Sequence, residues 1–101
     1  MMDIIFEWDA TKASLNKKKH SISFDEAKTV FFDENAIVIH DPEHSDNEER
    51  FVILGRSAVA RLLVVCHCFR NKDSVIRIIS ARKATKRESM QYHGGDYEKR
   101  I

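Results

Sequence analysis

The sequence predicts one α+β domain, in which an antiparallel sheet is packed with helices in the order β-α-α-β-β-β-β-α. Two observations predict this class. Helix-capping signals and helically spaced apolar residues occupy the first third and the end of the chain, whereas runs of β-branched residues, separated by short polar turns, fill the middle. The 101 residues are 43% hydrophobic and contain one proline and three glycines, which fits a single domain over residues 1–101.

The first three elements follow from local signals. Residues 4–8 are expected to form a strand, after which Asp9 can cap a helix over residues 10–18. Ser23 and Glu26 have the spacing of a capping box and predict a second helix. Its apolar face consists of residues at helical spacing, namely Phe24, Ala27, Val30 and Phe31.

The remaining elements are four strands and a C-terminal helix. The strands are expected at residues 36–39, 50–54, 62–69 and 75–81. The turns at residues 55–60 and 71–73 are short, so the strands that they join must be antiparallel neighbours. Thr85 and Glu88 form a second capping box, and the helix that it opens is expected to end at Gly94 and Gly95.

Composition narrows the class of protein further. No apolar stretch approaches the ~20 residues of a membrane span, and the N-terminus lacks the features of a signal peptide, so a cytoplasmic location is expected. Cys66 and Cys68 are two apart on a predicted strand, and we expect two buried thiols rather than a disulfide or a metal site. Residues 1–49 carry 5 Lys/Arg and 12 Asp/Glu, whereas residues 50–101 carry 12 and 4. The basic half could gather phosphates, although the opposite charges could equally interleave on the folded surface.

Four groups of residues match segments of one known family, in that family's own order. They are residues 6–9 with Lys12, Ala13 and Asn16; residues 19–27; Asp41, His44, Ser45 and residues 48–50; and residues 76–84 with Glu88 and Tyr92. In these segments the chain resembles the BrnT family. One departure is Ser21, where the family usually has glycine; a positive φ there would strain a serine.

The resemblance implies a RelE-like fold, cleavage of RNA and growth arrest by the free toxin. It also implies a ribbon-helix-helix antitoxin of the BrnA type, whose complex with the toxin represses their shared operon.

Cleavage of RNA without a metal sets the chemistry that the site must supply. The 2′-OH attacks the adjacent phosphate, so a base, an acid and several cations are needed, with no cofactor and no metal. The candidate catalytic residues are His20, Glu49, Arg50, Arg77 and Arg82. The candidate RNA-binding residues are Lys19, Arg61, Arg70, Lys83 and Tyr92.

Each candidate has its own reason and its own structural alternative. His20 can move a proton, because the ordinary pKa of an imidazole lies near neutrality, but it could also be a solvated helix end. Arg50 could orient Glu49 as a base, or the two could form an exposed ion pair. Arg77 interrupts an apolar strand, and simple alternation places it on one face with Val75, Ile79 and Ala81. Glu88 is expected to cap its helix rather than to act in catalysis.

Three functions remain open at this point. The first is the RNA-cleaving toxin, with two copies of each chain in a complex with its antitoxin, and with operator DNA bound only through the antitoxin. The second is a non-catalytic co-repressor or adaptor that binds an antitoxin. The third is a metal-dependent nuclease built on the donors of the segment 40–44, His40, Asp41, Glu43 and His44.

Overall fold

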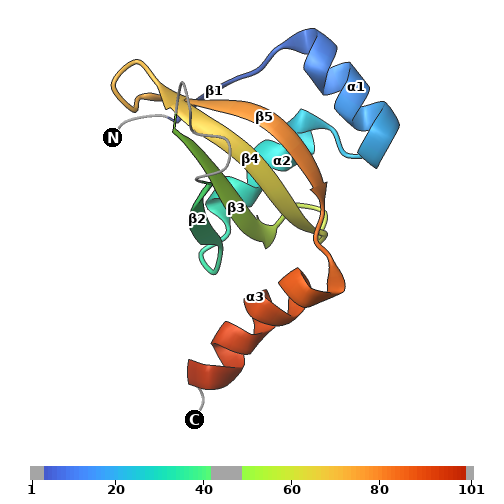
Figure 1. The fold of residues 1–101 in the computed structure, drawn as a ribbon, viewed down its shortest axis with the longest axis vertical. Helices are drawn as coiled ribbons and strands as arrows, with labels where there is room; N and C mark the ends of the chain where they lie inside the picture. Colours follow the sequence, from blue (N-terminus) through green and yellow to red (C-terminus); the bar gives the residue numbers. More distant parts are fainter. Residues whose placement is uncertain (1–3, 42–48, 100–101) are drawn as a thin grey trace.

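A computed structural model describes residues 4–41 and 49–99 of the chain, and Figure 1 shows its fold. The predicted class and element order are confirmed. The strands are β1 (Ile5–Glu7), β2 (Ile37–Asp41), β3 (Arg50–Arg56), β4 (Leu62–Arg70) and β5 (Val75–Lys83). The helices are α1 (Ala10–His20), α2 (Phe24–Thr29), the short 3-10 helix η1 (Val30–Phe32) and α3 (Lys86–Lys99).

The five strands form one sheet in the order β1-β5-β4-β3-β2. The three hairpin-like pairs β2–β3, β3–β4 and β4–β5 are antiparallel, as their short connections require. The strand β1 differs, because it pairs in parallel with β5, with Ile5 opposite Val75 and Glu7 opposite Arg77. The sheet is therefore mixed rather than wholly antiparallel, and the long connection through α1, α2 and the other strands allows this parallel pair.

A β-bulge in β5 changes which residues share a face. Cys66 lies opposite Ser80, but the next residue of β4, His67, lies opposite Ile78, so Ile79 is the extra residue. Beyond the bulge, Ala81 joins Ile78 in the core, whereas Ser80 and Ile79 line the other face together. The predicted alternation that placed Ala81 on the face of Ile79 and Ser80 on the face of Ile78 was therefore wrong. Single-strand alternation cannot reveal a bulge that is defined by the partner strand.

The main core lies between the sheet and the helices α1 and α2, which cover one face (Figure 1). Its buried residues are Ile22, Phe24, Ala27, Val30, Ile53, Leu63, Val65, Ile78 and Ala81. The predicted caps hold these helices in place, because the Asp9 carboxylate accepts from the Lys12 backbone N–H at 2.9 Å and the Ser23 hydroxyl accepts from Glu26 at 3.0 Å. Cap and apolar face together fix the orientation of α2 over the sheet.

Buried Asn16 fastens α1 to the outer edge of β5. Its amide donates to the carbonyls of Ala81 at 2.9 Å and Ile22 at 3.1 Å, and its oxygen accepts from the Ala81 N–H at 3.1 Å. The short strand β1 pairs only with residues 75–77 of β5, so the edge beyond it has no strand neighbour. The Asn16 side chain replaces the missing strand at that point.

The helix α3 begins as predicted but ends differently. Thr85 and Glu88 form the reciprocal capping box, with bonds of 2.8 and 3.1 Å. The helix passes through Gly94 and continues to Lys99, so the prediction that the glycines end it was wrong. A glycine ends a helix when it adopts a left-handed conformation, and no described glycine has a positive φ. None of the described helices is both long and apolar enough to span a membrane.

Candidate functional site

The face of the sheet that α1 and α2 leave uncovered contains a hollow of about 290 Å³. It lies over β3, β4 and β5, and α3 packs beside it through Tyr92, which contacts Leu54 and Val64. Its lining combines apolar side chains, a thiol, a hydroxyl and arginines from two strands. The lining residues are Arg50, Val52, Val64, Cys66, Ile79, Ser80 and Arg82.

The structure brings the three candidate catalytic arginines to this face. Arg50 and Arg82 line the hollow itself. Arg77 lies opposite Cys68, two residues further along β4 than Cys66, and also opposite Glu7 of β1. Cys66 and Cys68 are both thiols on this face, as their spacing predicted, although only Cys68 is buried.

Carboxylates hold two of these arginines. Arg77 Nη1 donates to Glu7 at 2.7 Å, and this bond raises the pKa of Arg77. Arg82 Nη1 and Nη2 donate to the two oxygens of Glu88 at 2.8 and 2.9 Å. These bonds, against the opposing effect of burial, lower the pKa of Glu88 to about 2. Glu88 is therefore ionised at neutral pH, and it also caps α3 as predicted.

Glu49 lies at a different hollow from Arg50. This second hollow, of about 480 Å³, is lined by Glu49, Phe51, Phe69 and Asp73. Phe51 and Phe69 contact the buried ring of His67, which packs against Phe31 on the helix-covered face. Glu49 and Arg50 therefore line different hollows, and the role of Glu49 as a base stays a prediction.

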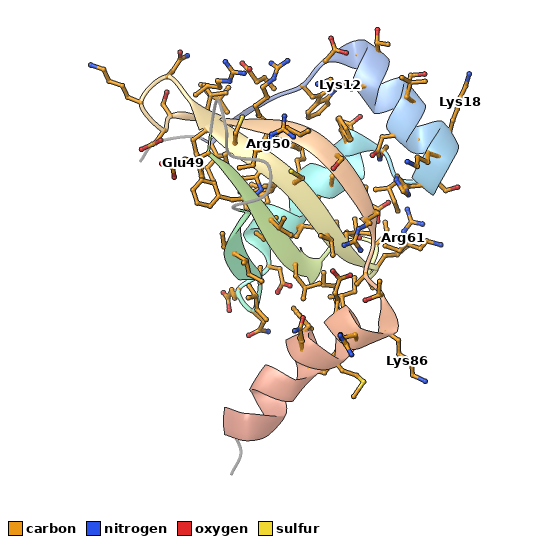
Figure 2. The ribbon with its side chains drawn as sticks, viewed as in Figure 1. Lys12, Lys18, Glu49, Arg50, Arg61 and Lys86 are labelled. Carbon is orange, nitrogen blue, oxygen red and sulfur yellow. The ribbon has the colours of Figure 1, made fainter. Side chains whose placement is uncertain are left out.

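A second basic group gathers at the C-terminal end of α1. His20 is the last residue of α1 and lies one helical turn beyond Asn16, which contacts the edge of β5. Arg61 donates to the Ser21 carbonyl at 3.4 Å. It also forms a hydrogen-bonded ion pair with Glu26, and this pair lowers the pKa of Glu26 against the opposing effect of burial. Figure 2 shows Arg61 near the end of β5, well apart from Arg50 at the other end of the sheet.

The other predicted RNA-binding residues fall in three places. Lys19 is exposed beside His20, and Lys83 is close enough to Glu26 to lower its pKa by its charge. Arg70 is exposed at the end of β4. Tyr92 is buried, and its hydroxyl donates to Asp33 at 2.7 Å, so stacking on a base would require it to leave this position.

The described residues hold no cluster of three or more side chains that could bind a metal ion. The metal-ligand candidates of the segment 40–44 have side chains outside the described part of the chain.

The sequence analysis missed several residues of the hollow. Cys66 and Ser80 were assigned no role, and Glu7 was not paired with Arg77. Alternation from Arg50 and Val52 gives the correct face for β3, and a search for the strand opposite would have found Cys66. Ser80 was hidden by the bulge, and Glu7 is 70 residues from its partner.

The fold and the hollow define a small α+β protein with helices on one face of its sheet and arginines on the other. A family model described as "Ribonuclease toxin, BrnT, of type II toxin-antitoxin system" matches residues 8–88. The chain therefore belongs to the BrnT family of ribonuclease toxins, and a toxin of this type has an antitoxin partner.

A solved structure supports the fold independently. The 1.1 Å crystal structure of the Brucella abortus ribonuclease toxin BrnT has a TM-score of 0.61 and 24% sequence identity to the chain. The match covers 85% of this chain and 100% of that one. No curated protein sequence gives a significant match.

Proposed function

We propose that the protein is a toxin that cleaves RNA without a metal ion, with the open-face hollow as the place where the scissile phosphate binds. The observation that carries this proposal is that Arg50 and Arg82, from two different strands, line one hollow on the uncovered side of the sheet. Two guanidinium groups around one hollow can hold a phosphate and stabilise the extra negative charge of its transition state.

The reaction divides into bond changes and proton transfers. The 2′-oxygen forms a bond to the adjacent phosphorus, and the bond from phosphorus to the 5′-oxygen breaks, which gives a 2′,3′-cyclic phosphate and a 5′-OH. A base takes the 2′-OH proton, and an acid gives a proton to the leaving oxygen. Arg50, Arg77 and Arg82 are the proposed cations. His20 and Glu49 are the proton-transfer groups predicted from the sequence; neither lines the open-face hollow, so both would have to approach the phosphate from its surroundings.

The remaining basic residues extend the proposed RNA contact. Lys19, Arg61 and Lys83 lie around the end of α1 and β5, and Arg70 lies at the opposite end of β4. Their contacts would be to RNA phosphates, which gives affinity that falls with salt. These four basic residues lie too far apart to contact one phosphate, so the proposed substrate is a strand of several nucleotides.

The proposed partner is a BrnA-like ribbon-helix-helix antitoxin. Such antitoxins are dimers, so the complex holds two toxins and two antitoxins, and operator DNA is bound through the antitoxin. The antitoxin keeps the toxin inactive in the cytoplasm until it is removed. Co-purification of the two chains and the mass of their complex in solution test this assembly directly.

Incubation of the antitoxin-free protein with RNA in excess EDTA tests the activity. We expect cleavage to persist, with 2′,3′-cyclic phosphate ends. Arg50→Ala should lower the cleavage rate by about 10²-fold or more, as expected for removal of one group that stabilises transition-state charge. Arg87→Ala, which removes an exposed guanidinium from α3, is the matched control and should stay within about twofold of the original rate.

Two results would contradict the proposal. Cleavage that returns only when a divalent metal is added favours the metal-dependent nuclease. A folded, antitoxin-binding protein that cleaves no RNA favours the adaptor. The adaptor has one observation on its side, since Arg61, Arg77 and Arg82 each form an ion pair with a carboxylate, as structural arginines do.

A further inference from the structure

Glu88 accepts two hydrogen bonds from Arg82, one of the two arginines that line the open-face hollow. We propose that Glu88 is a positioning residue, which orients the Arg82 guanidinium so that its free edge faces the phosphate of the RNA. This inference rests on the proposed ribonuclease function. It assigns to Glu88 a role beyond the helix cap that its spacing from Thr85 predicts.

The hydrogen bonds of Arg82 leave one edge of its guanidinium available. An arginine has five N–H groups. Nη1 donates to Glu88 and, at 3.3 Å, to the Lys83 carbonyl, and Nη2 donates to the other oxygen of Glu88. Within residues 4–41 and 49–99, no side chain or carbonyl accepts from the Nε–H or the second Nη2–H, and these two lie side by side on the same edge. That edge is the fork that binds two oxygens of one phosphate.

Glu88 is itself held rigidly, so it can transmit a fixed orientation. Its carboxylate accepts from the Thr85 backbone N–H at 2.8 Å, a bond that does not involve the Thr85 side chain. Without the ion pair to Glu88, the Arg82 side chain, which is 41% exposed, could adopt several rotamers. A guanidinium held in one rotamer pays less of that entropy when the transition state forms.

The chemistry of Glu88 excludes a role as the general acid. Its pKa is lowered to about 2, chiefly by the Arg82 hydrogen bonds, so it carries no proton to give at neutral pH. Its contribution therefore passes through Arg82. A purely structural cap is the alternative, and the two roles can be separated because they use different contacts.

Two substitutions separate the roles. Glu88→Gln keeps an oxygen that can accept from Thr85, since glutamine also serves in capping boxes. It turns an amide NH₂ toward Arg82, where two donors then face each other. Thr85→Ala has the opposite effect, because it removes the bond from the Glu88 N–H and leaves the Arg82–Glu88 ion pair intact.

The test measures the single-turnover cleavage rate at saturating RNA, and the Kd for an RNA whose 2′-OH at the cleavage site is replaced by hydrogen. We expect Glu88→Gln to lower the rate by about 10- to 100-fold while the Kd changes by less than about threefold, as for loss of a group that orients a catalytic one. Thr85→Ala should cleave within about twofold of the original rate despite a lower Tm. In the double variant Arg82→Ala/Glu88→Gln, the rate should be no lower than in Arg82→Ala alone.

The outcomes distinguish this inference from the proposed function. If the original protein cleaves RNA and Glu88→Gln cleaves equally fast, or if the two losses multiply in the double variant, Glu88 does not act through Arg82. If Glu88→Gln does not fold, Arg82→Lys decides, because lysine keeps the charge without the fork; a full rate there overturns the inference. Absence of cleavage by the original folded protein overturns the proposed function and this inference together.

Discussion

The face of the sheet under α1 and α2 is filled with apolar side chains, whereas the other face is covered only in part, by residues of α3 and the segment before it. Among the described residues, nine buried side chains form the first cluster and three the second, so most of the apolar burial that stabilises the fold lies under the helices. The uncovered face instead carries arginines held by carboxylates. Stability and the proposed chemistry are thus assigned to opposite sides of one sheet.

The two hollows show the same contrast in charge. Arg50 and Arg82 line the open-face hollow, whereas Glu49 and Asp73 line the hollow near Phe51. An RNA phosphate is attracted to the first and repelled by the second. The larger of the two hollows is therefore not the one proposed to bind the substrate.

The largest effect on stability is expected from the helix-covered face. Phe24 is 2% exposed and packs edge-to-face on Trp8 with ring centroids 5.9 Å apart. Phe24→Ala should lower the free energy of unfolding by about 3–5 kcal/mol, because it removes buried area and leaves a cavity. Urea denaturation measures this loss. Leu15→Ala, at an exposed position of α1, is the control. If Phe24→Ala lowers the free energy of unfolding no more than Leu15→Ala does, the helix-covered face is not the main source of stability.

A smaller loss is expected where α1 meets the sheet edge. Asn16→Ala leaves three backbone groups, in Ile22 and Ala81, without their side-chain partner. The free energy of unfolding should fall by about 2–3 kcal/mol, since buried polar groups that lose their bonds are costly. Asn35→Ala, at an exposed position, should change it by less than about 0.5 kcal/mol. Equal effects of the two substitutions would show that the hydrogen bonds of Asn16 to the backbone do not stabilise the fold.

The helix-covered face also predicts how stability depends on pH. His67 is buried among Phe31, Phe51 and Phe69, and burial lowers its pKa. The unfolded chain then binds a proton that the folded chain does not, so His67 costs no stability above about pH 6.5 and stability falls as the pH drops below that value. The slope is at most about 1.4 kcal/mol per pH unit for one proton.

The measurement is urea denaturation between pH 8 and pH 5. His67→Phe should remove this part of the slope, whereas His93→Gln, at an exposed position of α3, should keep it. A slope that is unchanged in His67→Phe would assign the pH dependence to other groups. Carboxylates such as Glu26 act in a lower range, because their pKa values are lowered in the folded protein and their stabilisation is lost only as the pH falls below about 4.5.

The parts of the fold that were predictable from the sequence are those set by neighbours in the chain. Asp9, Ser23 and Thr85 each cap a helix through a bond to a residue three positions away, and such spacing is visible without a structure. The strands likewise follow from runs of β-branched residues bounded by turns. The glycine usual at the position of Ser21 in the family raised the question of a positive φ there, and Ser21 has a φ of 60°.

The parts that were not predictable depend on distant partners. The bulge at Ile79 exists only because β5 has one residue more than β4 at that point, and it moved Ala81 and Ser80 to unexpected faces. The separation of His20 from Arg50 follows from how α1 docks along β5, which no local signal reports. The sequence therefore predicted the residue types of the site better than their arrangement.

Substitution of Ser21 has the smallest expected effect on the free energy of unfolding, and unlike the other substitutions it should raise that free energy. It ends α1 in the left-handed region, where its N–H donates to the Lys17 carbonyl at 2.9 Å. A serine pays roughly 1 kcal/mol for this conformation and a glycine does not, so Ser21→Gly should raise the free energy of unfolding by about 0.5–1 kcal/mol. Ser21→Ala is the matched control and should not be stabilising, because alanine has the same strain. A stabilising Ser21→Ala would assign the effect to the lost hydroxyl instead, and the junction beside His20 would then not be strained by its backbone.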